Sequence, residues 1–263
     1  MSPSESAPAL RSRVRAGDPL VGVFVKSSSY QVVEVLGRTG LDFVVFDAEH
    51  APFDRNALDV CLLAARANRL PALVRLPNPH ADTVLGVLDM GAEGIMAPHV
   101  QSAAGARELV ATTRYRDGQR GFSPSGRAGG YGTAAMADHI SAQDEGTTVL
   151  CQIEDTPGVE NVAEIAATDG VDCLFIGRAD LTVAYGAEAV DDPRVAAAVA
   201  RTCAAGRDAG VPVGMFLPSV AATPAFRDMG VSVFVFGSDQ GLLRSGADAL
   251  VGAFRDAVGD AAS

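Results

Sequence analysis

One sequence pattern recurs along the chain: a helical segment that ends near a Gly or Asn, a short turn, and then an apolar strand-like run. Gly suits the left-handed conformation that ends many helices, and continuous apolar runs suit strands that are buried on both faces. Eight runs are predicted, at residues 20–25, 43–47, 71–76, 94–98, 148–153, 173–177, 212–217 and 232–237. Eight β-α units in 263 residues are typical of an α/β fold, the (β/α)8 or TIM barrel.

A doubly wound parallel sheet is the alternative architecture. Such a sheet usually has fewer strands, and a Gly-rich phosphate-binding loop often follows its first strand. Residues 26–30 instead read Lys-Ser-Ser-Ser-Tyr, so the barrel is favoured. We expect one barrel domain over residues 19–263, preceded by a flexible N-terminal lead over residues 1–18 that is rich in Ser, Pro and Arg.

The bulk composition excludes several classes of partner. A formal net charge of −11 argues against a nucleic-acid polyanion. No apolar run approaches the roughly 20 residues that a membrane helix needs, and the first residues lack the apolar core of a signal peptide. The four cysteines form no C-x-x-C pair and are expected to be buried, reduced thiols. We therefore expect a cytoplasmic protein with no membrane partner.

Two acidic residues follow neighbouring strands of the predicted barrel. Glu154 comes after the fifth strand and Asp180 after the sixth, at the strand ends where the chemistry of such barrels collects. Two facing carboxylates repel one another unless one is protonated or a cation lies between them. The pair therefore predicts a divalent metal with open positions for a substrate, for which Mg²⁺, Mn²⁺ or Co²⁺ would serve. An ordinary salt bridge is the alternative for either acid.

Asp47 and His50 lie three residues apart where the second strand ends. A carboxylate that is hydrogen-bonded to one imidazole nitrogen fixes the tautomer and prepares the other nitrogen to act as a general base. Arg75, after the third strand, can donate to a carboxylate or to an enolate oxygen, or it can pair with Asp47 or Glu49. The other histidines have no such neighbour and are expected to be structural: His80, His99 and His139.

The connection between the fourth and fifth predicted strands is unusually long. Residues 114–132 are rich in Gly, Ser and Arg and include Arg120, Arg127 and Tyr131. A disordered insertion is one interpretation. An active-site loop is the favoured one, because functional residues often lie on long loops behind barrel strands.

Four segments of the chain resemble the HpcH/HpaI aldolases, the class II pyruvate aldolases. They are Phe46-Asp-Ala-Glu-His-Ala-Pro52, Val74-Arg75, Gln152-Ile-Glu154 and Ile176-Gly-Arg-Ala-Asp-Leu181. The resemblance runs in order from about residue 20 to residue 255. It rests on the four segments together at strand ends, since no single one is decisive.

The resemblance implies a divalent metal held by Glu154 and Asp180, which pyruvate would chelate through its carboxylate and keto oxygen. It implies that Gln152 helps to hold the metal's water or the substrate. It also implies that backbone amides near Ala179 and Asp180 hold the substrate carboxylate.

The resemblance further places Arg75 beside the keto oxygen and makes His50, supported by Asp47, part of the proton-transfer machinery. The implied reaction is the reversible aldol cleavage of a 4-hydroxy-2-oxo acid to pyruvate, or a close 2-oxo acid, and an aldehyde. Relatives of this kind assemble as hexamers, or trimers of dimers, and exchange a C-terminal helix, for which residues 239–257 are the candidate.

The chain departs from the family pattern at Arg178, where the family usually has proline. Arg178 and Arg120 could bind an acidic group on the aldehyde, or Arg178 could point to solvent. Lys26, the only lysine, is a rival nucleophile for a Schiff-base mechanism. Two further alternatives remain open: a CoA-ester lyase or citrate-synthase-like condensing enzyme of the same wider group, and a barrel that binds a metal and a 2-oxo acid without turnover.

Overall fold

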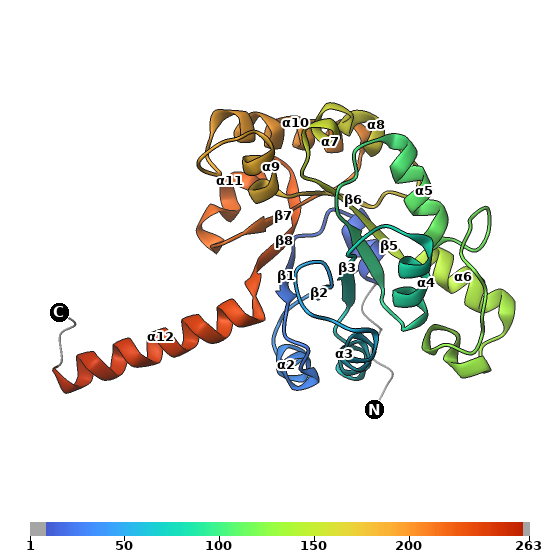
Figure 1. Cartoon of the computed structure of the whole chain (residues 1–263), viewed down its shortest axis with the longest axis horizontal. Helices are drawn as coiled ribbons and strands as arrows, with labels where there is room; N and C mark the ends of the chain where they lie inside the picture. The colour runs from blue at the N-terminus through green and yellow to red at the C-terminus, as the bar shows by residue number, and fades with distance from the viewer. Residues whose placement is uncertain (1–8, 260–263) are drawn as a thin grey trace.

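The apolar runs form eight parallel strands that close into a barrel in sequential order, as predicted. The structure is a computed structural model that describes residues 9–259 (Figure 1). The strands are β1 (Leu20–Val25), β2 (Phe43–Asp47), β3 (Ala72–Arg75), β4 (Gly94–Ala97), β5 (Thr148–Ile153), β6 (Cys173–Ile176), β7 (Val213–Leu217) and β8 (Val231–Ser238). Every strand begins and ends within one residue of its predicted bounds, so the (β/α)8 prediction is confirmed.

Helices alternate with the strands, and all but the last of them lie around the outside of the barrel (Figure 1). They are α2 (Tyr30–Leu36), α3 (Arg55–Ala67), α4 (Ala81–Asp89), α5 (Ala103–Thr113), α6 (Met136–Gly146), α7 (Thr156–Glu160), α8 (Val162–Ala166), α9 (Arg178–Ala184), α10 (Pro193–Ala209), α11 (Thr223–Asp228) and α12 (Asp239–Val258). Short 3-10 helices lie at Arg127–Gly132 and Val220–Ala222.

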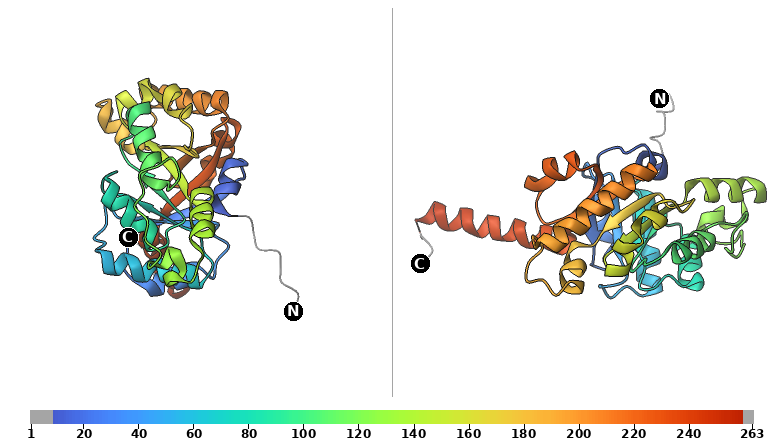
Figure 2. Two further views of the ribbon diagram at one scale, coloured as in Figure 1. Left: turned by 90° about the vertical axis from the view of Figure 1, so that its right-hand side faces the viewer. Right: turned by 90° about the horizontal axis from the view of Figure 1, so that it is seen from above.

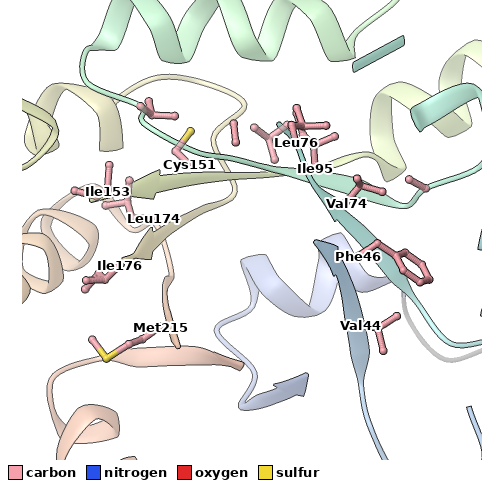
Figure 3. Close-up of a cluster of buried hydrophobic side chains, with 14 of the residues drawn as sticks. Val44, Phe46, Val74, Leu76, Ile95, Cys151, Ile153, Leu174, Ile176 and Met215 are labelled. Atoms are coloured by element: carbon pink, nitrogen blue, oxygen red, sulfur yellow. The ribbon is translucent and has the colours of Figure 1, made fainter. Parts of the chain in front are cut away.

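The core has two layers, because neighbouring residues of a strand point to opposite faces of the sheet. One layer fills the barrel with side chains such as Phe43, Leu73 and Phe175. The other lies between the strands and the helices and includes Phe46, Val74 and Ile176 (Figure 3). The polar strand ends therefore stand on a rigid, densely packed scaffold.

The N-terminal part of the chain differs from the predicted flexible lead. Helix α1 (Leu10–Arg15) buries Leu10 and Val14 in the same cluster as the barrel interior. Arg11 Nε lies 2.9 Å from the buried carboxylate of Asp172. This helix precedes β1 and packs where the strands begin, so residues 10–15 are part of the folded barrel. Residues 1–8 of the predicted lead lie outside the described residues.

Helix α12 leaves the barrel and extends away from it (Figures 1 and 2). Its apolar side chains are exposed along the helix: Leu242, Leu243, Leu250, Val251, Phe254 and Val258. An apolar groove of about 530 Å³ lies beside β1, β8 and α11, and its lining includes Leu20, Phe234 and Phe236. Within residues 9–259, no helix combines the length and the apolar character that crossing a membrane requires.

Candidate active site

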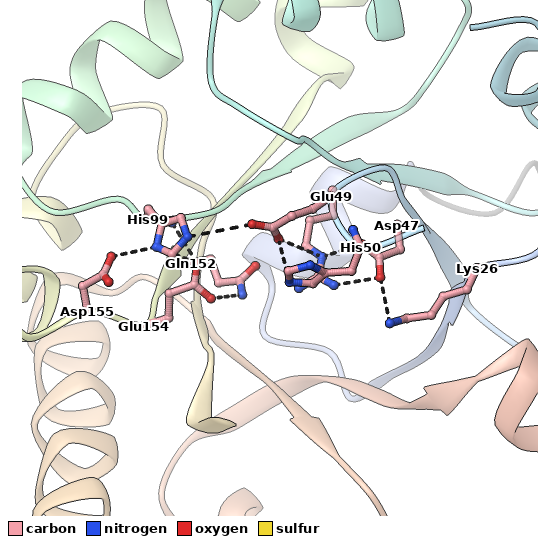
Figure 4. Close-up of polar contacts among 9 residues, drawn as sticks. Lys26, Asp47, Glu49, His50, His99, Gln152, Glu154 and Asp155 are labelled. Carbon is pink, nitrogen blue, oxygen red and sulfur yellow. Dashed lines mark hydrogen bonds and ion pairs between the residues drawn. The ribbon is translucent and has the colours of Figure 1, made fainter. Parts of the chain in front are cut away.

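The carboxyl ends of the strands bring charged residues from distant parts of the chain to one mouth of the barrel (Figure 4). Strand β2 ends at Asp47 and β3 ends at Arg75, and these two residues are paired in register. Strand β5 leads directly into Glu154, and β6 leads into α9, which carries Asp180. Polar residues at or after the ends of four strands thus lie together at this end of the barrel, as predicted.

Asp47 lies at the centre of a network of donors. Its fully buried carboxylate accepts hydrogen bonds from Arg75 Nε at 3.0 Å and Nη2 at 2.8 Å, and Lys26 Nζ lies 3.1 Å from Oδ2. The backbone amide of His50 also donates to Oδ1, at 3.1 Å. Burial acts to raise the pKa of Asp47, but the contacts with Arg75, His50 and Lys26 outweigh it and hold the pKa below its ordinary value.

The predicted contact between the Asp47 carboxylate and the His50 imidazole is not formed within residues 9–259. The carboxylate is already engaged by Arg75, Lys26 and the His50 amide, so the ring turns away from it. His50 Nε2 instead lies 3.7 Å from Glu49 Oε2, and 56% of the His50 side chain is exposed at the mouth. Glu49 is therefore the carboxylate that faces the imidazole.

Arg75 lies between two carboxylates. In addition to the two-point contact with Asp47, its Nε lies 3.4 Å from Glu49 Oε2. Its guanidinium carbon stands 4.6 Å from the centre of the Phe24 ring, at cation–π distance. Arg75 thus forms an ion pair with Asp47 and also with Glu49, the two alternative partners predicted from the sequence.

Glu154 is a buried carboxylate with few stabilising donors. Its side chain is 2% exposed; Oε1 accepts from the His99 amide at 2.9 Å, and Oε2 accepts from Gln152 Nε2. Burial is the main cause that raises the pKa of Glu154 to about 7, and the negative charges of Asp180 and Glu49 contribute further. A cation beside this carboxylate would offset the cost of ionising it in a buried position.

Gln152 offers a second sign of an incomplete environment. It is 2% exposed, and its Oε1 is buried without a hydrogen-bond partner among the described residues. A buried acceptor without a donor is costly in a folded protein, so a water or a bound ligand is expected beside it.

Gly177 leaves the space that Glu154 and Gln152 occupy. A Cβ at this position would lie 2.7 Å from Glu154 Oε2 and 3.2 Å from Gln152 Nε2. Its φ of −92° is ordinary, so the requirement for glycine is steric.

His99 belongs to this site, contrary to the expectation that it is structural. Its Nδ1 lies 3.0 Å from Asp155 Oδ2 and 3.4 Å from Glu154 Oε1, and its Nε2 lies 3.9 Å from Glu49 Oε1. Burial acts to lower its pKa, but Asp155, Glu154 and Glu49 raise it above the ordinary value. Sequence reasoning missed His99 and Asp155 and considered Glu49 only as a partner of Arg75, although each of the three stands within two residues of a predicted strand end.

The start of α9 brings Ala179 and Asp180 to the mouth but turns Arg178 away from it. Ala179 is exposed and Asp180 is half-buried. Arg178 Nη2 donates to the Val190 carbonyl at 2.9 Å, and the guanidinium lies 5.3 Å from the centre of the Phe226 ring. Arg178 thus holds the connection after α9 against α11, and this chain does not bring it to the other site residues.

Arg120 lies at the opposite end of the barrel from the predicted site. It pairs with Asp89 at 3.0 Å and bonds to Gln143 at 3.1 Å, on the helices α4 and α6 that lead into the amino ends of β4 and β5. Arg127 likewise donates to the Met90 carbonyl at 2.6 Å. The connection over residues 114–132 is ordered and does not cover the mouth of its own barrel, so the prediction that Arg120 binds substrate is wrong for a site built from one chain.

The residues at the mouth fit a hard divalent cation with few protein ligands. Glu154 and Asp180 could supply carboxylate oxygens, and Gln152, whose Oε1 has no partner among the described residues, contacts Glu154 through Nε2. Within residues 9–259, no group of three or more His, Cys, Asp or Glu side chains is arranged to enclose a metal. A cation held by two carboxylates would take its other ligands from substrate and water.

The chain matches known proteins over most of its length. It is 36% identical over 240 residues to a hydroxypyruvate/pyruvate aldolase of Paraburkholderia phytofirmans, covering 88% of this chain and 91% of that protein. It is 35% identical over 237 residues to a 5-keto-4-deoxy-D-glucarate aldolase of Enterobacter sp., covering 89% of this chain and 92% of that one. The crystal structure of the citrate synthase SbnG superposes with a TM-score of 0.85 at 28% identity, over 96% of this chain and 99% of that one.

The sequence profile described as HpcH/HpaI aldolase/citrate lyase matches residues 20–246, which span the whole barrel from β1 into α12. Together with the aldolase relatives, this match supports a lyase. The chain belongs to the HpcH/HpaI aldolase/citrate lyase family.

Proposed function

We propose that this protein is a class II aldolase that cleaves a 4-hydroxy-2-oxo acid, reversibly, to pyruvate or a close 2-oxo acid and an aldehyde. The observation that carries the proposal is Glu154, a buried carboxylate near Asp180 whose pKa is raised to about 7 and whose neighbour Gln152 has an oxygen with no partner within residues 9–259. The names of the aldolase relatives support the same reaction class.

Glu154 and Asp180 are the proposed ligands of a divalent cation, Mg²⁺, Mn²⁺ or Co²⁺. When bound, such an ion supplies Lewis-acid polarisation of the 2-oxo carbonyl and offsets the charge of the enolate. The unpartnered Gln152 Oε1 would accept a hydrogen bond from water or substrate at this point. The exposed Ala179 and its neighbour Asp180 would offer backbone N–H groups to the substrate carboxylate.

Arg75 is the proposed donor to the oxygen that gains charge when the carbon–carbon bond breaks. Its hydrogen bonds to Asp47 use Nε and Nη2, which leaves Nη1 for the substrate. A donor that is already oriented costs little to use in the transition state, and such donors are among the largest contributions to catalysis.

His50 is the proposed proton-transfer group. Its exposed ring stands at the mouth, with Nε2 facing Glu49. Asp47 supports His50 through the backbone amide, so its support fixes the turn that carries the ring and does not act on the imidazole.

A Schiff-base mechanism through Lys26 is disfavoured. A Schiff base needs an amine that is free to attack the substrate, whereas Lys26 Nζ is engaged by the buried carboxylate of Asp47 at 3.1 Å.

A citrate-synthase-like condensation is the second candidate, favoured by the likeness to SbnG. A CoA-ester lyase uses an enolate donor in the same way. Screening pyruvate, oxaloacetate and acyl-CoA donors against aldehyde and 2-oxo acid acceptors discriminates among the three. Metal binding without turnover of any of them would favour a non-catalytic barrel.

We further propose a homo-oligomer, a hexamer built as a trimer of dimers, in which α12 is exchanged between subunits. The exposed apolar side chains of α12 and the uncovered groove at Leu20, Phe234 and Phe236 support this assembly. A cytoplasmic location, small-molecule substrates and the absence of nucleic-acid partners remain predictions from the sequence.

The test of the proposed reaction is the release of pyruvate from a panel of 4-hydroxy-2-oxo acids. We expect release that EDTA abolishes, that added Mg²⁺, Mn²⁺ or Co²⁺ restores, and that Glu154→Ala eliminates. Release that survives both chelation and this substitution would contradict the proposal.

A further inference from the structure

Lys26 is a charged residue at the mouth to which the proposed reaction gives no role. It stands directly after β1, and its side chain is 30% exposed. Its ammonium lies 3.1 Å from Asp47 Oδ2, the same oxygen that accepts from Arg75 Nη2 at 2.8 Å (Figure 4). Lys26 and Arg75 thus share one buried carboxylate oxygen.

The backbone at Lys26 is held in place by Asp239 of helix α12. Its amide donates to Asp239 Oδ1 at 2.8 Å, and the amide of Ser27 donates to Asp239 Oδ2 at 3.0 Å. Asp239 is buried in the first turn of α12. This two-point contact holds the turn in place, so the ammonium is presented to Asp47 from an oriented backbone.

The contact between Lys26 and Asp47 changes the net charge around Arg75. Lys26 and Arg75 bring two positive charges, and Asp47 and Glu49 bring two negative charges. Without Lys26, the remaining three residues would carry a net negative charge beside the proposed substrate position of Arg75. This negative charge would oppose an enolate, and Arg75 would be the only cation of the group shared by the two carboxylates.

We infer that Lys26 is a positioning residue that acts through Asp47: by sharing Oδ2 with Arg75 and offsetting the charge of Asp47, it keeps Arg75 free to stabilise the enolate. The inference rests on the proposed function and deepens it at the same site. Lys26 needs no contact with the substrate for this role.

The test is the exchange of pyruvate methyl protons in deuterated buffer with Mn²⁺, measured by NMR for the full-length wild type and for Lys26→Met, Lys26→Arg and Arg38→Met. Lys26→Met removes the charge and keeps the length of the side chain. We expect its kcat for exchange to fall about 10-fold, as the loss of one nearby charge predicts, with a smaller change in KM, and Lys26→Arg to recover most of the loss. Arg38 is exposed and precedes β2, on the side of the barrel where the strands begin, so Arg38→Met controls for the change in net charge.

A double-substitution cycle separates this role from others. In an Asp47→Asn background, Lys26→Met should change kcat by less than about 2-fold, because the charge that Lys26 offsets is gone. An equal loss in both backgrounds would overturn the inference, since Lys26 would then act without Asp47. A melting temperature and Mn²⁺ affinity that fall together with kcat, without recovery in Lys26→Arg, would also overturn it. Absence of exchange in the wild type would overturn the proposed function itself, whereas exchange that Lys26→Met leaves unchanged would overturn only this inference.

Discussion

The guanidinium of Arg75 and the carboxylate of Asp47 face one another edge to edge, with Nε 3.0 Å from Oδ1 and Nη2 2.8 Å from Oδ2. The two residues end neighbouring strands and are paired in register, so the barrel itself sets their separation. The contact uses one edge of the guanidinium and leaves Nη1 available.

Replacing Arg75 by lysine should remove this orientation while keeping the charge. An ammonium cannot make the two-point contact with Asp47 and also direct a donor to the substrate. We expect Arg75→Lys to lower kcat for aldol cleavage about 100-fold, the usual cost of losing an oriented donor to a developing oxyanion. Steady-state kinetics of purified variants measures this, with Arg38→Lys as the matched control on the surface. Activity within a few-fold of wild type would show that Arg75 does not act on the reacting oxygen.

Glu154 should make the metal-free protein less stable as the pH rises. Folding raises its pKa to about 7, so between its ordinary value and about 7 the folded state keeps a proton that the unfolded state releases. Stability is therefore lost as the pH rises through this window. We expect Glu154→Gln to raise the melting temperature of chelated protein at pH 8 by about 5 °C, from an effect on the order of 2 kcal/mol, and to change it little at pH 5.

The same pair of proteins should reverse its order when metal is added. Saturating Mn²⁺ stabilises only a protein that binds it, so the wild type should then melt above Glu154→Gln at pH 8. Calorimetry with and without EDTA measures both effects. If the wild type and Glu154→Gln melt at the same temperature both with EDTA and with Mn²⁺, then burial of Glu154 does not destabilise the chelated protein and Glu154 does not bind the cation.

Gly177→Ala should disturb the metal ligand by steric contact alone. The added Cβ would lie 2.7 Å from Glu154 Oε2, so the carboxylate must move. We expect Mn²⁺ affinity, measured by titration calorimetry, to fall at least about 10-fold, because misplaced ligands and their supporting contacts typically cost this much. Gly40, which has open space around it, provides the matched control. Affinity that stays equal in Gly177→Ala and Gly40→Ala would contradict the assignment of Glu154 as a ligand.

The apolar face of α12 should hold the oligomer together. Leu250 and Phe254 lie four residues apart on one exposed face of the helix, and Ser245 lies on the opposite face. Leu250→Asp should reduce the mass of the assembly measured by light scattering, whereas Ser245→Asp should leave it unchanged. A monomeric wild type, or an equal effect of both substitutions, would refute the exchange of α12.

The sequence was sufficient for the barrel because parallel strands buried on both faces produce apolar runs, and these runs recur eight times, most of them directly after a helix end and a short turn. The strand bounds then located Asp47, Arg75, Glu154 and Asp180, since any polar residue after such a run must stand at the mouth. These predictions needed only the order of the elements.

The contacts within the mouth could not be predicted in the same way, because several partners compete for each side chain. Asp47 had three donors within reach, and Arg75 and Lys26 displaced the imidazole of His50. His99 was assigned a structural role because its partners lie on other strands. Arg120 was predicted to bind substrate only because its loop is rich in Gly, Ser and Arg. The chain between β4 and β5 instead brings Arg120 to the other end of the barrel.

The exchange of pyruvate methyl protons in deuterated buffer tests the central claim most directly, because it requires only that the enolate forms and needs no knowledge of the aldehyde. We expect the wild type with Mn²⁺ to incorporate deuterium, EDTA to stop the incorporation, and Glu154→Ala and Arg75→Lys each to reduce it at least about 100-fold. Metal binding without any exchange, or exchange that persists in EDTA, would contradict a metal-assisted enolate at Glu154 and Asp180.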